Sequence, residues 1–489
     1  MSVTGPLKRL SHRTLLFVAV AAITCAVKAP GVDQVDGAFR IQLAENVLHG
    51  ELSMEPDPDW PMFFRAGQDG RTYSIYGLGQ PLVLAPMVLV TGASPETPVS
   101  RAALVWLYTI SINLALAGAI YGVFRQIGLT ARGAGLSTLA LMVVTPWLIW
   151  GHSLQEEALV GAALAGALYC TMRRLKSDGE VWAAVAGLLA AFTANARPNA
   201  VFIAGALFVW LVCCTGRGRF RTAAVFLAGS LPSLALFFWW NLHRFGNPLQ
   251  TGWQTGNDAW SFQFDLFLNL LILPDFGLLW FAPLLLVLPA ARGRARLRLL
   301  AWLVLLGFVM HAVLLAGYPR YVGHALGAAW GPRYMMHGVL FVAPLVWLGW
   351  LRVRRSRFRA LAFVLLVGST TIQWAGIMFP PRLEHAQDEF RRERSLGPME
   401  PYAWLPRRFT NLYWWATGDL EDRSFPNDPV GGDRVATRPD FLPARLATSP
   451  KLAHDKGLGA LLWGGFVVLV VVVAGAVHLM LRKRQPTSC

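Results

Sequence analysis

Long apolar runs recur along the whole chain and constrain its fold more than any other feature. A bilayer core about 30 Å thick needs roughly 20 apolar residues per helix. Runs near this size lie at residues 14–29, 102–124, 134–150, 155–172, 181–195, 198–215, 222–241, 265–289, 299–317, 334–351, 360–379 and 459–481. Only 15% of the 489 residues are charged, too few to cover the surface of a soluble protein of this size. The sequence therefore predicts an all-α polytopic membrane protein with about 12 transmembrane helices.

Basic residues between the apolar runs set the expected orientation. The chain has 44 Lys+Arg against 28 Asp+Glu, and the bases gather in short bursts such as Arg217, Arg219 and Arg221. Short loops rich in Lys and Arg face the cytoplasm, and this assignment makes the runs alternate across the membrane. Nucleic-acid binding is excluded as a function class, because it needs one continuous basic face.

The orientation rule divides the chain into three regions. Residues 1–379 form a transmembrane region with an external loop at 30–100 between its first two spans. Residues 380–458 are expected to be an irregular extracytoplasmic segment because Pro, Gly and Asp punctuate them. Residues 459–489 supply the last transmembrane helix and a basic cytoplasmic tail. The first run also fits a secretory signal peptide, which would leave the loop outside in either case.

One further apolar stretch must not cross the membrane if the charge rule holds. Pro81 to Thr91 spans only about 11 residues, whereas a crossing needs roughly 20. It is therefore predicted to be an interfacial or re-entrant segment.

Cysteine usage indicates neither a disulfide framework nor a metal centre. Four of the five cysteines, Cys25, Cys170, Cys213 and Cys214, lie in or beside apolar runs, and Cys489 is the last residue. No Cys/His spacing typical of a zinc site is present. A divalent metal is compatible with the chain, but nothing in the sequence indicates one.

The external loop begins with two aspartates, Asp33 and Asp36. Downstream, the apolar residues at 41, 44, 47 and 48 share one helical face, which predicts an amphipathic surface helix near 36–49. A carboxylate at the start of this helix is well placed to take a proton from an acceptor hydroxyl beside a lipid-borne donor. The alternative is that Asp36 only caps the helix.

Other polar residues outside the membrane are weaker candidates. Tyr73 and Tyr76, with Gln80 after them, either line a sugar pocket or are interfacial aromatics. His152, Glu156 and Glu157 lie at an external helix start. The acids there either serve an acceptor site or complement the helix dipole, and His152 with Glu156 makes too small a set to claim a metal site.

Three motifs together resemble the GT-C superfamily of membrane glycosyltransferases, of the bacterial protein-mannosyltransferase and aminoarabinose-transferase type. They are Asp36-Gly37-Ala38-Phe39-Arg40, the stretch from Tyr73 to Pro81, and Trp330-Gly331-Pro332-Arg333-Tyr334. The resemblance covers roughly residues 10–350. It implies a polyprenyl-phosphate sugar donor and an Asp base in the first external loop, a role that falls on Asp36 with Asp33 as competitor.

A polyprenyl-phosphate leaving group needs cations where its negative charge develops. Arg197, Arg320 and Arg333 lie at external helix ends, and Arg333 is the favoured phosphate ligand. The alternative is that these arginines extend to lipid head groups. Tyr334 beside Arg333 is added to the candidate sugar pocket.

The implied function is transfer of a sugar, with inversion, to an extracytoplasmic glycan, lipid or protein acceptor. The expected partners are this donor, the acceptor and membrane lipids, and no nucleic acid. The site would face the periplasmic side of a bacterial inner membrane. A lipid-linked sugar flippase or transporter, a surface-glycan polymerase or ligase, and a non-catalytic scaffold remain as alternatives. The nearly charge-free interiors of the runs favour an enzyme over a transporter.

Overall fold

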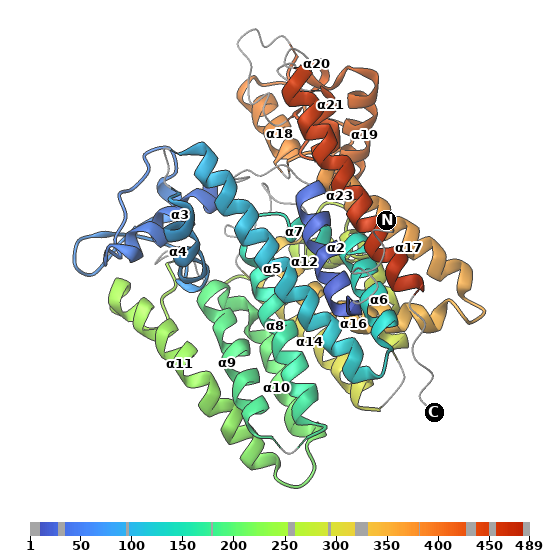
Figure 1. Ribbon diagram of the computed structural model, residues 1–489. Helices are drawn as coiled ribbons and strands as arrows, with labels where there is room; N and C mark the ends of the chain where they lie inside the picture. Colours follow the sequence, from blue (N-terminus) through green and yellow to red (C-terminus); the bar gives the residue numbers. More distant parts are fainter. Residues whose placement is uncertain are drawn as a thin grey trace.

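The computed structural model describes residues 10–27, 35–93, 97–177, 179–252, 260–291, 295–317, 331–380, 382–426, 437–448 and 456–482. These residues are mainly α-helical, as predicted (Figure 1). Within this part of the chain the only strands are β1 (Phe64–Ala66) and β2 (Thr72–Ser74), which pair antiparallel with Arg65 opposite Tyr73.

Helices make up most of the described chain. In chain order they are α2 (His12–Val27), α3 (Val35–Leu48), η1 (Pro61–Phe63), α4 (Gly79–Thr91), α5 (Pro98–Ile127), α6 (Ala131–Val144), α7 (Trp147–Trp150), α8 (Glu156–Arg174), α9 (Val181–Ala196), η2 (Pro198–Ala200), α10 (Val201–Cys214), α11 (Arg219–Phe245), α12 (Phe264–Leu271), α13 (Leu278–Phe281), η3 (Pro283–Ala290), α14 (Ala295–Ala316), η4 (Arg333–Met335), α16 (Met336–Val353), α17 (Arg359–Met378), α18 (Leu383–Glu393), α19 (Trp404–Thr417), α20 (Leu420–Ser424), α21 (Leu442–Thr448) and α23 (Lys456–Arg482).

Six of these helices are long and apolar enough to cross a membrane, which identifies an integral membrane protein. They cover Val99–Ile127, Arg219–Phe245, Ala295–Ala316, Arg333–Val353, Arg359–Met378 and Gly459–Leu481. Five shorter apolar helices accompany them. The predicted total of about 12 crossings therefore stays a prediction.

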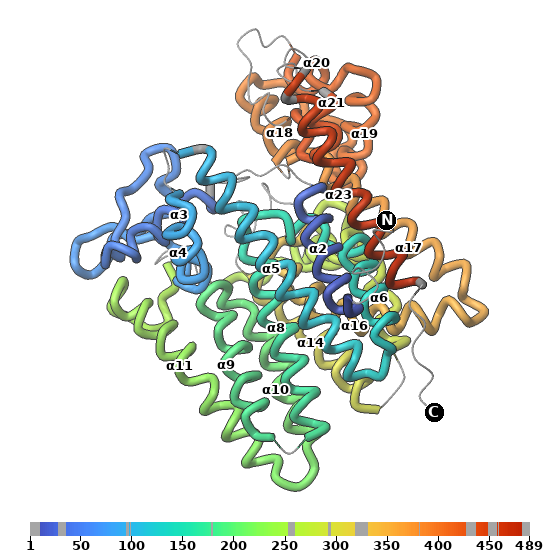
Figure 2. Tube along the Cα trace, in the orientation of Figure 1, coloured from blue at the N-terminus to red at the C-terminus, as the bar shows by residue number. Residues whose placement is uncertain are grey.

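The long helices form one bundle in which sequence neighbours pack side by side. Helix α8 packs on α5 and α9, and α9 packs on α11 (Figure 1). Helix α23, the last of the described helices, lies beside α2, the first of them (Figure 2). The largest apolar core lies among α2, α5, α6, α8, α14 and α16, and it fixes the ends of these helices relative to one another.

The prediction of one helical span at 265–289 is wrong. The structure forms three short pieces there, α12, α13 and η3. Pro274 and Pro283 lack the backbone N–H that an α-helix needs, and Gly277 precedes α13 with extended backbone angles. A prediction based only on the apolar content of the segment does not detect these breaks between the three helical pieces.

The described part of the segment 380–458 is not irregular as predicted, because it contains α18, α19, α20 and α21. Arg408 of α19 donates hydrogen bonds to both carboxylate oxygens of Glu384 of α18, at 2.7 and 2.5 Å, and both side chains are buried. The Pro and Gly residues that suggested a loop gather between 425 and 433, and most of them lie outside the described residues. Upstream of them, good helix formers dominate.

Helix α3 forms close to the predicted range, but part of its apolar face is covered by protein, while Leu48 is 40% exposed. Ile41 and Ala44 pack in one cluster with Leu84 of α4 and Leu104 of α5. Helix α4 has 13 residues, fewer than a crossing needs. Where the two helices lie relative to the bilayer stays a prediction.

Helices α9 and α11 approach each other at two glycines. A Cβ on Gly187 would lie 1.9 Å from the carbonyl oxygen of Phe226, and one on Gly229 would lie 2.1 Å from that of Ala184. Small residues at such positions let two membrane helices pack backbone against backbone. This contact fixes the end of α9 that carries Arg197.

We expect Gly187→Ala to lower the free energy of unfolding by about 2 kcal/mol, because the added methyl must push α11 away. Thermal unfolding of the detergent-solubilised chain measures the change. Gly205→Ala in α10 is the matched control, since its Cβ would meet nothing within 4 Å. Equal stability of the two variants would contradict the tight contact.

Candidate functional site

Three arginines and three carboxylates form one buried cluster, here called the charge cluster. Its members are Asp36 and Arg40 of α3, Glu156 and Glu157 at the start of α8, Arg197 after α9, and Arg333 at the start of η4. None of the six is more than 8% exposed. Three positive and three negative formal charges cancel, so the cluster is neutral as a whole.

Arg333 makes the most varied contacts in the charge cluster. Its Nη2 donates a hydrogen bond to Oδ2 of Asp36 at 2.7 Å, and its Nε donates to Oε1 of Glu157 at 2.8 Å. It also donates to the amide oxygen of Gln155, and its Nη2 lies 3.8 Å from Glu156. One guanidinium thus joins α3, α8 and η4.

The other two arginines complete the ring of ion pairs. Arg40 pairs with Glu156, and its Nη2 lies 3.8 Å from Oδ2 of Asp36 one helical turn away. Arg197 lies 3.0 Å from Oε1 of Glu156 and also pairs with Glu157. Each carboxylate therefore has at least two cationic neighbours, which is what keeps charges stable away from water.

Local sequence explains why these side chains meet. Glu156 and Glu157 occupy the first turn of α8, where the helix dipole favours acids. Pro198 ends α9 directly after Arg197. The turn after Tyr76 packs onto the same helix end, because a Cβ on Gly77 would lie 1.9 Å from the carbonyl oxygen of Asn195. Only glycine fits this close approach.

The electrostatics of Asp36 follow from its neighbours. Burial opposes ionisation, but the positive charges of Arg333 and Arg40 and the hydrogen bonds from Arg333 and Tyr76 outweigh it and lower the pKa of Asp36 to about 2. Asp36 is therefore a carboxylate at neutral pH. It is a weak base for as long as Arg333 holds it.

Two aromatic rings cover the cations. Arg40 lies over the ring of Tyr76, 4.3 Å from its centroid, and Arg197 lies over the ring of Tyr334 at 4.6 Å. Such contacts stabilise a desolvated guanidinium by about 2 kcal/mol. Tyr76 and Tyr334 thus lie against the charge cluster, and their role in a sugar pocket stays a prediction.

Gln80 and His152 lie beside the cluster and support the chain around it. The amide nitrogen of Gln80 donates to the Tyr108 hydroxyl at 3.1 Å and to the carbonyl oxygen of Leu154 at 2.7 Å, one residue before Gln155. Nδ1 of His152 lies 2.6 Å from the carbonyl oxygen of Leu148. Both contacts position the segment that leads into α8.

Tyr73 is not brought to the charge cluster. Its hydroxyl donates to Asp69 at 2.7 Å, and its ring packs edge-on against Trp240. Burial and the neighbouring Asp69 raise the pKa of Tyr73 to about 12. The residue helps to hold the β1–β2 hairpin against the end of α11, where Arg244 also donates to the carbonyl oxygen of Ser74 at 2.5 Å.

Asp33 and Arg320 lie outside the described residues, so the structure does not place them.

Sequence reasoning missed Arg40 and Gln155. A signal for Arg40 was present, because it follows Asp36 by four residues on one helix, the spacing of an ion pair. The sequence around Gln155 gave no such signal, since the role of Gln155 depends on its contact with Arg333 from a distant part of the chain.

No cluster suited to a metal ion is found within the described ranges, taking three or more His, Cys, Asp or Glu as the requirement. The three carboxylates of the charge cluster are paired with arginines instead.

Searches against protein-family models and curated proteins find no match. Solved structures do match. ArnT from Cupriavidus metallidurans bound to undecaprenyl phosphate aligns with a TM-score of 0.51 and 14% identity over 98% of this chain and 78% of ArnT. The apo form of that protein aligns with a TM-score of 0.51 and 14% identity over 95% of this chain and 76% of ArnT. This chain has the GT-C fold.

The oligosaccharyltransferase of Archaeoglobus fulgidus, in complex with Zn and sulfate, is more distant. Its TM-score is 0.42 at 13% identity, over 77% of this chain and 55% of that protein. The ArnT matches confirm the GT-C resemblance at the level of the fold.

The pKa of Asp36 predicts a specific response to acid. Because its pKa in the folded chain, about 2, lies below the ordinary 3.8, ionised Asp36 contributes stability above about pH 4, and this contribution, about 2 kcal/mol, is lost as the pH falls through 2. Asp36→Asn should therefore reduce the loss of stability between about pH 5 and pH 2. Chemical unfolding in detergent across this range measures it.

Asp59→Asn is the control for this experiment, because Asp59 is an exposed aspartate of the same loop. It should keep the wild-type dependence on pH. An unchanged acid response in Asp36→Asn would contradict the ion pairing of Asp36.

Proposed function

We propose that this protein is a membrane glycosyltransferase that moves a sugar from a polyprenyl-phosphate carrier to an extracytoplasmic acceptor. The observation that carries the proposal is the buried charge cluster in a chain with the GT-C fold. A matching protein of that fold, ArnT from Cupriavidus metallidurans, has been solved with undecaprenyl phosphate bound. A phosphate-bearing lipid is the kind of ligand that a set of buried arginines fits.

Arg333 and Arg197 are the proposed donor-phosphate ligands, and Arg320 is a further candidate. Both described arginines are held by carboxylates of the same cluster. Electrostatic preorganisation of this kind stabilises the charge that develops on a leaving phosphate. Arg40, which pairs with Glu156 and lies beside Asp36, is a positioning residue for the base.

Asp36 is the proposed base, with Asp33 as competitor. Its low pKa makes it a poor base while Arg333 donates to it at 2.7 Å. A donor phosphate is a second anion that competes for the same guanidinium. When the phosphate takes Arg333, Asp36 loses a cation and gains an anionic neighbour, and both changes raise its pKa. Donor binding would thus activate the base.

The reaction is a single displacement with inversion. The acceptor oxygen or nitrogen attacks the anomeric carbon, and the bond from that carbon to the phosphate oxygen breaks. The acceptor proton passes to Asp36, and polyprenyl phosphate leaves with the bonding electrons. Protonation of the leaving group is not required, because a phosphate is stable as an anion and the arginines offset its charge.

The acceptor would meet the charge cluster from its aromatic side. Tyr76 and Tyr334 lie over Arg40 and Arg197 and offer the flat apolar surface on which a sugar ring packs. Glu156 and Glu157 are bound to arginines and would act as positioning residues. A glycan, a lipid or a protein hydroxyl or amine all fit this chemistry.

The proposed topology has about 12 crossings, with the arginine-rich loops on the cytoplasmic side. In this arrangement the external loop carrying α3 and α4, the charge cluster and the segment 380–458 all face the periplasm of a bacterial inner membrane. The short α4 of 13 residues supports a segment that does not cross.

A lipid-linked sugar flippase is the second candidate, since it would bind the same donor. The location of the charge cluster at the ends of α8, α9 and α16, away from the helix interiors, favours the enzyme. A polymerase or ligase of surface glycans would share the chemistry and differ only in its acceptor.

The test is sugar transfer in sealed right-side-out vesicles, with undecaprenyl-phosphate sugars and a mixed acceptor extract added from outside. Asp36→Asn should lower turnover by about 100-fold or more, the usual loss when a general base is removed. Release of undecaprenyl phosphate is the readout.

Asp59→Asn controls for the loss of one carboxylate from the same loop and should turn over like the wild type. Full activity of Asp36→Asn would remove Asp36 from the mechanism, and a loss confined to Asp33→Asn would move the role to its competitor. Flux of labelled donor lipid without any transfer would favour the flippase.

A further inference from the structure

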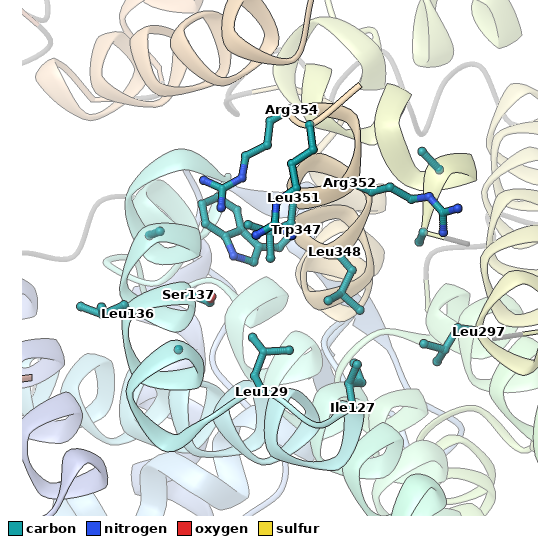
Figure 3. A pocket seen from close by; sticks show the side chains of 15 residues that line it. Ile127, Leu129, Leu136, Ser137, Leu297, Trp347, Leu348, Leu351, Arg352 and Arg354 are labelled. Atoms are coloured by element: carbon teal, nitrogen blue, oxygen red, sulfur yellow. The ribbon is translucent and has the colours of Figure 1, made fainter. Parts of the chain in front are cut away.

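A hollow lies between α6, η3 and α16, far from the charge cluster. It has a volume of about 930 Å³, and its lining includes Leu129, Ala140, Leu297 and Leu348. Figure 3 shows Trp347, Leu348 and Leu129 around this space. It lies at the end of α16 opposite Arg333, roughly 27 Å away along the helix. The hollow is therefore a separate site.

Basic side chains alone supply the charge of this hollow. Arg352, Arg354 and Arg355 belong to its lining, and none of its 15 lining residues is acidic. Arg354 lies over the ring of Trp350, 4.9 Å from its centroid, which restrains its side chain. An apolar space with guanidinium groups at one end suits an anion that carries an apolar tail.

Trp347 adds a polar group without a partner. Its side chain lines the hollow and is 8% exposed, and its buried indole N–H has no acceptor among the described residues. The neighbouring Trp350 differs, because its indole N–H donates to the carbonyl oxygen of Ala362 at 2.9 Å. An unpaired buried donor costs about 1–3 kcal/mol. A ligand oxygen in the hollow would remove this cost.

We propose that the hollow is a binding site for one anionic phospholipid from the arginine-rich side of the membrane. Its phosphate lies among Arg352, Arg354 and Arg355, and an acyl chain fills the apolar space. The ester carbonyls of a phospholipid lie just below the phosphate, at the depth where indole groups are found in membrane proteins. One of them accepts the hydrogen bond of Trp347.

The positive charge of the hollow and its distance from the charge cluster favour an anionic phospholipid over other ligands. A soluble anion would leave the apolar walls unfilled, and a zwitterionic lipid would bring a cation toward the arginines. The polyprenyl-phosphate sugar is the proposed donor at the charge cluster, at the other end of α16, where its carrier would be released. Only this exclusion of the carrier lipid rests on the proposed function, because the hollow, its arginines and Trp347 are features of the structure itself.

The test is native mass spectrometry of the purified full chain, titrated with dioleoyl phosphatidylglycerol. The double variant Arg354→Gln with Arg355→Gln should weaken binding by about tenfold or more, since each arginine near an anionic lipid contributes about 1 kcal/mol. Trp347→Phe keeps the ring and removes the N–H, and should weaken binding by about fivefold.

Two further variants separate this site from general surface charge. Arg357→Gln with Arg359→Gln removes the same charge from the same connection, but neither residue lines the hollow. This control should bind within about twofold of the wild type, because the lipid phosphate does not reach it. Ala140→Phe fills the hollow without changing charge and should abolish binding of the lipid.

Three results would overturn the proposal. If both double-arginine variants weakened lipid binding equally, binding would depend on general surface charge and not on the hollow. Equal binding of dioleoyl phosphatidylcholine would exclude selection by charge. Stronger binding of undecaprenyl phosphate, blocked by Ala140→Phe, would make the hollow a site for the carrier lipid.

Discussion

The ion pairs of Arg333 are the interaction on which the rest of this structure depends. A guanidinium that is only 6% exposed is stable only if anions and other hydrogen-bond acceptors surround it. The carboxylates of Asp36 and Glu157 and the amide oxygen of Gln155 come from two distant parts of the chain to do so. The contact draws α3 onto the ends of α8 and η4. Because Arg197 and Arg40 share the same carboxylates, the whole site forms as one unit.

The zero net charge of the charge cluster determines how it responds to a bound anion. Three cations and three anions balance in the free protein, so an incoming phosphate adds one negative charge that the cluster must accommodate. It does so by raising the proton affinity of a carboxylate, which is what a general base needs in order to take the acceptor proton later in the reaction. Binding of the donor and activation of the base are thus two consequences of the same electrostatic balance. At the opposite end of α16 the described residues that line the hollow include three arginines and no acid, and there a permanently anionic lipid fits.

Much of the fold could be predicted from the sequence, because burial in a bilayer demands long apolar runs. The helices near 102–124, 222–241 and 360–379 appear as expected, but 265–289 breaks at its prolines and 380–458 forms helices. The residues of the charge cluster were harder to predict. Asp36, Arg197 and Arg333 stand out as charges at helix ends, and Arg40 follows Asp36 at the spacing of an ion pair. The role of Gln155, in contrast, depends on partners more than 100 residues away. Local patterns report which residues are unusual, and tertiary contacts decide which of them meet.

Competition between a donor phosphate and Asp36 for Arg333 is the central claim, and the affinity of Asp36→Asn for undecaprenyl phosphate tests it most directly. Removing the carboxylate releases Arg333 and leaves a buried positive charge that the phosphate can neutralise. The account predicts that the variant binds undecaprenyl phosphate about tenfold more tightly than the wild type near neutral pH, a gain of about 1.4 kcal/mol. Affinity that is unchanged or weaker would mean that the phosphate does not replace Asp36 at Arg333, and would contradict the account.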